Sequence, residues 1–271
     1  MNPSSNAQAT LYRLRFAPPT AQGGPIVFTF SDPTPWQAVG EAEYLSAPPT
    51  SAAFPVNERI NILVLPSSLK DDSRWLEGAR AWLTQPDQPE AFSVQAGGIQ
   101  VSWRPGQAVI VAPPAQALAA LEAVVDFAYY ENELRKIEKE IAGAWPAVEA
   151  DTPLAYNTVV SDLSRDKETG QRVHQLFQNR MRHARIEPHL IRPPARFSRP
   201  ARDLSEGLRE AALCKERAET ADGQVEVQEH VYEMASQRLG EFRHARQGFI
   251  LETIIIVLLA VEVILMIIEI L

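Results

Sequence analysis

The last 23 residues of the chain constrain it more than any other part, because Phe249–Leu271 is almost continuously apolar (FILETIIIVLLAVEVILMIIEIL). A helix needs about 20 apolar residues to cross the hydrocarbon core of a bilayer. The segment therefore predicts one C-terminal transmembrane helix over residues 249–271. Because no residue follows it in the sequence, we expect this helix to be a tail anchor for the preceding residues.

Three glutamates interrupt this apolar run. Glu252 and Glu269 lie near its two ends, where a carboxylate can reach the head groups, whereas Glu262 lies near the bilayer centre. An ionised carboxylate is costly at that depth, so Glu262 is expected to be protonated, paired or turned towards protein. We expect all three glutamates to contribute an intramembrane contact between copies of the chain. Two alternatives stay open: a proton or ion path through Glu262, and a run that is a buried bundle helix instead of a membrane span.

Three arginines, Arg238, Arg243 and Arg246, stand shortly before the apolar run. Cytoplasmic segments next to a membrane helix carry an excess of Lys and Arg. We interpret these arginines as a topology signal that places the body of the chain in the cytoplasm, with membrane lipid as a partner. A bacterial inner membrane is the first expectation and the mitochondrial inner membrane is the second.

Residues 1–112 have the pattern of a small α/β unit. Short apolar runs, several of them alternating with polar residues, predict six strands, and one amphipathic helix is expected at Ser67–Thr84. The pair Gly97-Gly98 is typical of a hairpin turn. The strands are expected at Leu11–Phe16, Pro25–Phe30, Ile60–Leu65, Ala91–Gln95, Ile99–Trp103 and Gln107–Ala112.

Residues 113–202 read as a helical region that contains a connection rich in arginine and proline. A first helix is predicted at Ala115–Trp145, with an apolar first half that is expected to be buried. Pro146 is expected to end this helix, because proline removes a hydrogen bond and clashes with the preceding turn. The neighbouring acids Glu131 and Glu133 are interpreted as part of a solvated, charged face.

A second helix is expected to begin at Asp151-Thr152-Pro153, where a capping side chain precedes a proline in the first turn. It should run to about Arg185, because Pro188 excludes a continuous helix beyond about Glu187. Its core face is expected to consist of Val159, Leu163, Gly170, Val173, Phe177 and Met181.

The stretch from residue 180 to residue 202 is strongly cationic. We expect its arginines to brace the acidic helices that precede it, within a subunit or between subunits. Two alternatives are a surface for anionic lipid, because a membrane anchor follows, and an RNA surface, which the scarcity of aromatic residues makes weaker. The arginines are Arg180, Arg182, Arg185, Arg192, Arg196, Arg199 and Arg202.

Residues 203–248 predict a coiled-coil stalk, because two rows of mostly small or apolar residues repeat every seven positions. Asp222-Gly223 is the point at which one helix could end and another begin. The packing partner could be the two preceding helices of the same chain or a second copy, and the pattern does not separate them. The rows are Leu204, Ala211, Ala218, Val225, Tyr232, Leu239 and Arg246, and Gly207, Cys214, Ala221, Gln228, Ala235, Phe242 and Phe249.

No motif in the chain predicts catalysis. Cys214, the one cysteine, falls within a heptad row and is interpreted as a packed residue and not as a nucleophile. The five histidines lack the spacing of metal ligands, and the motifs of serine hydrolases, zinc proteases and phosphate loops are absent. We therefore expect a protein that is not an enzyme, with no catalytic residue, no cofactor, no metal and no small-molecule substrate.

The tail carries a resemblance to a known family. Leu251-Glu252, Ile254-Ile255-Ile256 and Val261-Glu262-Val263 are similar to the C-terminal pattern of the required-for-meiotic-nuclear-division family, a domain of unknown function. In that family a Leu-Glu pair opens a single terminal membrane helix and a Glu-Val pair lies inside it. Val125–Ile141 also resembles the family's first long helix, and the resemblance covers about residues 107–271.

The resemblance implies a membrane-anchored, oligomeric protein without known catalysis. Mitochondrial members of the family act in support of translation at the inner membrane. For this chain, that implies a tether whose partner is another protein or a ribonucleoprotein.

These patterns predict an α+β protein: a small N-terminal α/β unit, long antiparallel helices that form a coiled-coil-like stalk, and one C-terminal transmembrane helix. The expected function is a scaffold or tether that self-associates as a homo-oligomer through its stalk and membrane helix. The alternative is a subunit of an oligomeric ion- or proton-conducting assembly with Glu262 in the membrane.

Overall fold

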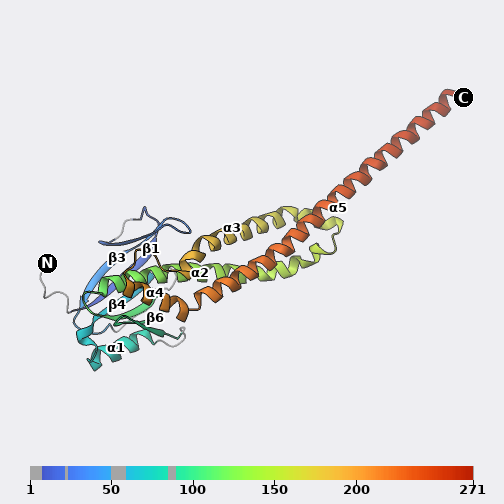
Figure 1. The fold of residues 1–271 in the computed structure, drawn as a ribbon. Helices are drawn as coiled ribbons and strands as arrows, with labels where there is room; N and C mark the ends of the chain where they lie inside the picture. The colour runs from blue at the N-terminus through green and yellow to red at the C-terminus, as the bar shows by residue number, and fades with distance from the viewer. Residues whose placement is uncertain (1–7, 22–23, 50–58, 85–89, 271) are drawn as a thin grey trace. The chain divides into compact units, whose positions relative to one another are not determined.

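The computed structural model describes residues 8–21, 24–49, 59–84 and 90–270, so Leu271, the last residue of the predicted span, lies outside the described residues. The protein belongs to the α+β class, with a sheet formed by its N-terminal part and long helices after it (Figure 1). The chain divides into two compact units. Unit 1 comprises Met1–Lys139 and Met181–Ala221, and unit 2 comprises Glu140–Arg180 and Asp222–Leu271.

Unit 1 is built on a seven-stranded sheet with the order β2-β3-β1-β4-β7-β6-β5. Neighbouring strands pair antiparallel, except for β4 and β7, which are parallel. The strands are β1 (Ala9–Ala17), β2 (Ile26–Phe30), β3 (Trp36–Leu45), β4 (Arg59–Pro66), β5 (Phe92–Ala96), β6 (Ile99–Arg104) and β7 (Gln107–Ala112).

Helix α1 (Ser73–Leu83) covers one face of this sheet. The register places Leu63 of β4 opposite Leu11 of β1 and Val109 of β7. These three side chains form a buried cluster with Trp75 of α1. The amphipathic pattern of α1 therefore has a structural cause, because its apolar side chains face the sheet.

The first part of helix α2 (Ala117–Asp151) covers the other face, mainly through aromatic contacts. The ring of Phe127 lies 5.0 Å from that of Trp103, and the ring of Tyr129 lies 5.4 Å from that of Phe16. The buried first half expected for this helix is confirmed. Because both faces of the sheet are covered, β4 and β7 are buried almost throughout, which explains their continuous apolar sequences.

All six predicted strands are present, and β3 was missed. Only Ala38 and Val39 of this strand are buried, so its sequence lacks a clear apolar alternation. Its backbone pairs with β1 on one side and β2 on the other, and this pairing defines it as a strand. A Cβ atom at Gly40 would lie 1.9 Å from the carbonyl oxygen of Arg13, so the close approach of β1 requires glycine there.

Pro146 does not end α2, as the sequence predicted, because the helix continues to Asp151. In unit 2, Val148 is buried in a cluster with Leu176 and Tyr232, and Trp145 packs against the same cluster. A proline inside a helix costs about 3 kcal/mol. Burial of the apolar side chains on both sides of Pro146 offsets this cost, so the packing keeps the helix intact.

Helix α3 (Asp166–Ile191) differs from its prediction at both ends. It begins 15 residues after Asp151, which is not a cap but a buried carboxylate that pairs with Arg165 and Arg172. It continues through Pro188, where the sequence predicted its end. Short 3-10 helices at Thr152–Ala155 and Val160–Arg165 fill the connection.

The core face predicted for α3 is wrong. Val173, Phe177 and Met181 are 40, 54 and 44% exposed, and Val159, before the helix, is 56% exposed. The reason is that polar side chains occupy part of the buried face, so the apolar pattern pointed to the wrong side. The buried face contains Leu176, Asn179, His183, Ile186 and Leu190.

Helices α4 (Arg199–Ala211) and α5 (Cys214–Ile270) meet at Leu213, whose φ of 52° lies in the left-handed region. A residue in this conformation ends a helix. The possible break at Asp222-Gly223 is absent, because α5 is continuous there. Glycine costs about 1 kcal/mol inside a helix, which the buried positions of α5 on either side of it can offset.

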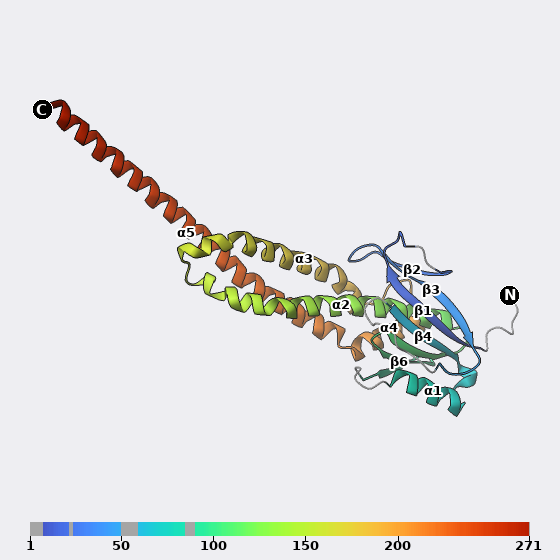
Figure 2. The same ribbon diagram turned by 180° about the vertical axis from the view of Figure 1, so that it is seen from behind.

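Between Cys214 and Leu239, the buried positions of α5 follow the three-four spacing of the heptad rows, whereas the later row members Arg246 and Phe249 are exposed. In unit 1 the buried positions are Cys214, Ala218 and Ala221, and in unit 2 they are Val225, Gln228, Tyr232, Ala235 and Leu239. We call the five positions in unit 2 the seam. The seam packs against α2 and α3 of the same chain, which run beside α5 in both views (Figures 1 and 2).

Candidate functional site

The C-terminal segment of α5 is the most unusual surface of the protein. Every described side chain from Phe249 to Ile268 is exposed, and most of them are large and apolar. The segment extends past the other helices of unit 2 (Figure 2). Its 22 residues from 249 to 270 would span about 33 Å at 1.5 Å per residue, close to the thickness of a bilayer core. By length and composition, this helix can cross a membrane.

The glutamates of the apolar segment all lie within α5. Glu252 and Glu262 are exposed, and the side chain of Glu269 lies outside the described residues. Glu262 is ten residues from Glu252, about 15 Å along the helix axis, which places it in the middle of the segment. Among the residues that the structure describes, none covers the side chain of Glu262.

The three arginines before the segment lie in α5 as well, and all are exposed. Arg238 pairs with Glu241 at 3.3 Å, one turn further along the helix. Arg246 lies three residues before Phe249, where a cation can reach lipid phosphates. The arginines therefore stand where a helix would enter a bilayer.

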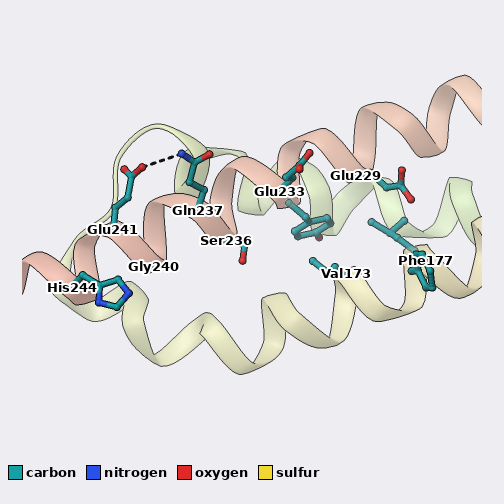
Figure 3. A pocket seen from close by; sticks show the side chains of 11 residues that line it. Val173, Phe177, Glu229, Glu233, Ser236, Gln237, Gly240, Glu241 and His244 are labelled. Carbon is teal, nitrogen blue, oxygen red and sulfur yellow. Dashed lines mark hydrogen bonds between the residues drawn. The ribbon is translucent and has the colours of Figure 1, made fainter.

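A groove of about 770 Å³ lies between α3 and α5 in unit 2 (Figure 3). The α3 wall is apolar and contributes Val173, Leu176 and Phe177. The wall from α5 is polar and ends at His244, five residues before the apolar segment. Its members are Glu229, Tyr232, Glu233, Ser236, Gln237, Gly240, Glu241 and His244. The groove therefore has an apolar wall that faces a wall with three carboxylates.

The seven arginines of residues 180–202 have different environments. Three of them pair with carboxylates: Arg180 with Glu229 in unit 2, and, in unit 1, Arg182 with Glu133 and Arg196 with Glu122. Two bond to backbone carbonyl oxygens, namely Arg185 to Pro33 and Arg202 to Ala195 and Phe197. Arg192 and Arg199 are exposed. The stretch is therefore mostly engaged within the chain.

Glu131 and Glu133 do not form a solvated face, because they are only 2 and 7% exposed. Arg217 of α5 bonds to Glu131 at 3.1 Å and to Glu138 at 2.7 Å. Desolvation would lower the pKa of Arg217, but Glu138 and Glu131 together raise it above its ordinary value. Glu131 and Glu138 are therefore ion-pair partners of α5, and Glu133 pairs with Lys136 and Arg182.

Cys214 lies beside this ion-pair cluster and is fully buried. Desolvation, with a smaller contribution from the charge of Glu131, raises the pKa of its thiol to about 11. Only a thiolate is a strong nucleophile. The position is consistent with a packed residue, as the sequence indicated.

The most deeply buried ion pair of the described residues was not predicted from the sequence. Asp126 of α2 and Arg209 of α4 lie 2.9 Å apart with side chains only 4 and 5% exposed. Arg209 also donates to the carbonyl oxygen of His189 at 2.7 Å. Burial raises the pKa of Asp126 even though Arg209 acts to lower it. The sequence does contain a signal for this pair, because Asp126 is an acid within an otherwise apolar stretch of α2, which suggests a buried carboxylate that needs a partner.

Comparison with known proteins provides no family: no protein-family model matches the chain, and no curated protein does. Within the described part of the chain, no group of three or more His, Cys, Asp or Glu side chains is placed to hold a metal ion. Among the described residues, the exposed apolar segment and the groove, both in unit 2, are two features able to act on other molecules.

Proposed function

We propose that this protein is a membrane-anchored scaffold or tether without enzymatic activity, which self-associates and keeps its folded body on the cytoplasmic side. The observation that carries the proposal is the complete exposure of an apolar helical segment of about six turns. A helix that is apolar on all sides is stable only when it is buried in protein or lipid. The described residues do not bury this segment, so we expect it to lie in lipid.

Self-association is supported by Glu262. A carboxylate near the bilayer centre is tolerated when it faces protein and not lipid. Since no side chain of the described chain covers Glu262, a second copy is the simplest source of that protein surface. Interhelical hydrogen bonds in membranes contribute about 0.6 kcal/mol on average, and more in favourable cases.

The tethering role follows from the placement of charge. The exposed arginines before the apolar segment favour the cytoplasmic leaflet. Arg192 and Arg199 remain available on the surface of unit 1 for an anionic partner, such as a protein or a ribonucleoprotein. The resemblance of the tail to the required-for-meiotic-nuclear-division family supports the same role.

Changing Glu262 tests the self-association. We expect Glu262→Leu to weaken assembly by about 1 kcal/mol, roughly fivefold, because it removes the hydrogen-bonding group. The matched variant Glu262→Gln keeps that group and should assemble like the wild type. Native gels and light scattering of the detergent-solubilised full chain measure the distribution of species. Unchanged assembly of Glu262→Leu would remove Glu262 from the contact.

An ion- or proton-conducting assembly is the second candidate, and the isolated carboxylate in the middle of the apolar segment favours it. If Glu262 carries protons or ions, purified protein in liposomes should collapse an imposed gradient. Glu262→Gln should then abolish the flux while leaving assembly intact. A flat trace for both proteins would eliminate this candidate.

A further inference from the structure

The seam of α5 is already occupied within the chain, so self-association of the soluble part requires another surface. Tyr232 packs with Val148 and Leu176, and Gln228 donates to the carbonyl oxygen of Ile141. One surface that stays open in unit 2 is the groove between α3 and α5, with Phe177 exposed at its edge. We propose that this surface packs against the same surface of a second copy. The proposal rests on the proposed function and names where the anchored chains meet.

The shape of this surface, which we call the α3–α5 face, suits a helical partner. We define it by Val173 and Phe177 of α3 and by Glu233, Ser236 and Gly240 of α5. Val173 and Phe177 are one turn apart, and both remain in contact with water. A Cβ atom at Gly240 would meet nothing within 4 Å, so another helix has room to approach α5 there.

The contact would be isologous, meaning that the same residues act on both sides of a two-fold axis. Phe177 of each copy would enter the groove of the other copy. Two α3 helices and two α5 helices would then surround the buried Val173 and Phe177 side chains, as in a four-helix bundle. Burial of apolar side chains from water is the driving force.

One pairing of opposite charges between the copies fits this contact. The α5 wall of the groove is acidic, and Glu241 lies near its membrane end. The packing of Leu176 against Tyr232 shows how α3 and α5 are aligned, and in this antiparallel alignment Lys167 lies level with Glu241. Lys167 is exposed. A two-fold axis parallel to the helices brings Lys167 of one copy to the level of Glu241 of the other.

The membrane segment adds an independent reason. α5 is unbroken between His244, which lines the groove, and Glu262, which lies 18 residues later. Eighteen residues are five turns of an α-helix, so both residues project from the same face of α5. Two anchored chains share one membrane plane, so their two-fold axis runs along the membrane normal. A single two-fold axis therefore allows both the contact between the α3–α5 faces and the contact at Glu262.

Cysteine cross-linking of the full chain in membranes tests the contact. The buried Cys214 is first replaced by alanine, and single cysteines are then introduced. Phe177→Cys reports on the α3–α5 face, and Ile255→Cys reports on the membrane face that carries Glu262. The control is Gln171→Cys, which is also exposed on α3 but lies about 120° around the helix from Phe177. Oxidation with copper phenanthroline is followed by non-reducing gels.

We expect disulfide-linked dimers with Phe177→Cys and Ile255→Cys and none with Gln171→Cys. Dimers with Ile255→Cys alone would overturn the inference and leave self-association through the membrane helix standing. If neither Phe177→Cys nor Ile255→Cys forms dimers, both the contact through the α3–α5 face and self-association through the membrane helix are overturned. Equal dimer yields with Phe177→Cys and Gln171→Cys would indicate random collisions and would also overturn the inference. Dimers with Phe177→Cys alone would support the inference and remove the membrane contact from the proposed function.

A polar variant gives the second measurement. Phe177→Ser should weaken dimerisation in lipid vesicles about 10- to 100-fold, because it removes most of the apolar area of the contact. Phe177→Leu stays apolar and should remain within about threefold of the wild type. Energy transfer between labelled chains at increasing surface density measures the dimer fraction. If purified Phe177→Ser dimerises like the wild type, a second copy is not the occupant of the groove.

Discussion

Replacing both Leu258 and Leu259 with arginine is expected to remove the chain from the membrane fraction. Fifteen Leu, Ile, Val and Phe residues lie between positions 249 and 268. At about 0.3–0.6 kcal/mol each near the bilayer centre, they favour insertion by at most roughly 5–9 kcal/mol. Two arginines at the centre cost roughly 5–7 kcal/mol, and Glu262 already carries a cost of its own. The cost of the charged residues is then comparable to or larger than the free energy gained from the apolar residues, so the segment should no longer insert.

Extraction of membranes with alkaline carbonate measures this effect. The wild-type chain should stay in the pellet, and the double arginine variant should move to the supernatant or to aggregates. The matched control, Leu258→Ile with Leu259→Val, keeps the segment apolar and should stay in the pellet. If the arginine variant also resists extraction, the apolar segment does not span the membrane. Tryptophan fluorescence should be the same in all three proteins, because no tryptophan lies in the changed segment.

Replacing Arg209 with methionine should destabilise unit 1 by about 3–5 kcal/mol, the usual cost of breaking a buried ion pair from one side. The change leaves Asp126 buried without its cation, and it also removes the donor to the carbonyl oxygen of His189. The midpoint of urea unfolding, followed by tryptophan fluorescence of the full chain in detergent, measures the loss. The matched change Arg196→Met should cost less than about 1 kcal/mol, because its pair with Glu122 is exposed.

The pH dependence of the Arg209→Met variant has a definite sign. Burial already raises the pKa of Asp126, and loss of Arg209 raises it further. The destabilisation is therefore smallest below the ordinary pKa of aspartate, where Asp126 is protonated in both states, and it grows as the pH rises. Adding Asp126→Leu should recover most of the lost stability at neutral pH, because no buried charge is left. If the double variant is as unstable as Arg209→Met, the unpaired charge is not the cause.

Local patterns predicted the elements that are buried along their length or at regular intervals. The runs that became β4 and β7 and the heptad rows of α5 fall in this group, because burial alone determined their spacing. β3 was missed because it is held by backbone pairing on both sides, which leaves little trace in side-chain polarity. The predictions that helices end at or near Pro146 and Pro188 were wrong, because tertiary packing outweighs the local cost of a proline.

The groove and the buried ion pair could not be read from the sequence for a different reason. Asp126 and Arg209 are 83 positions apart, and nothing local links an acid in α2 to a cation in α4. The exposure of Phe177 likewise depends on which face of α3 meets α5, and polar residues such as Asn179 and His183 occupy the buried face. The apolar segment could be predicted because length and composition alone identify a helix able to cross a membrane.

The short distance between His244 and Phe249 determines which molecules can reach the groove. Five residues of unbroken helix correspond to about 7.5 Å, so the membrane end of the groove would lie at the level of the lipid head groups. A partner dissolved in the bulk would have to enter this crowded layer from above. A partner confined to the bilayer diffuses in two dimensions and meets the groove at a much higher effective concentration. Binding at this groove would then depend on how densely the bilayer is populated and only weakly on what is dissolved around it.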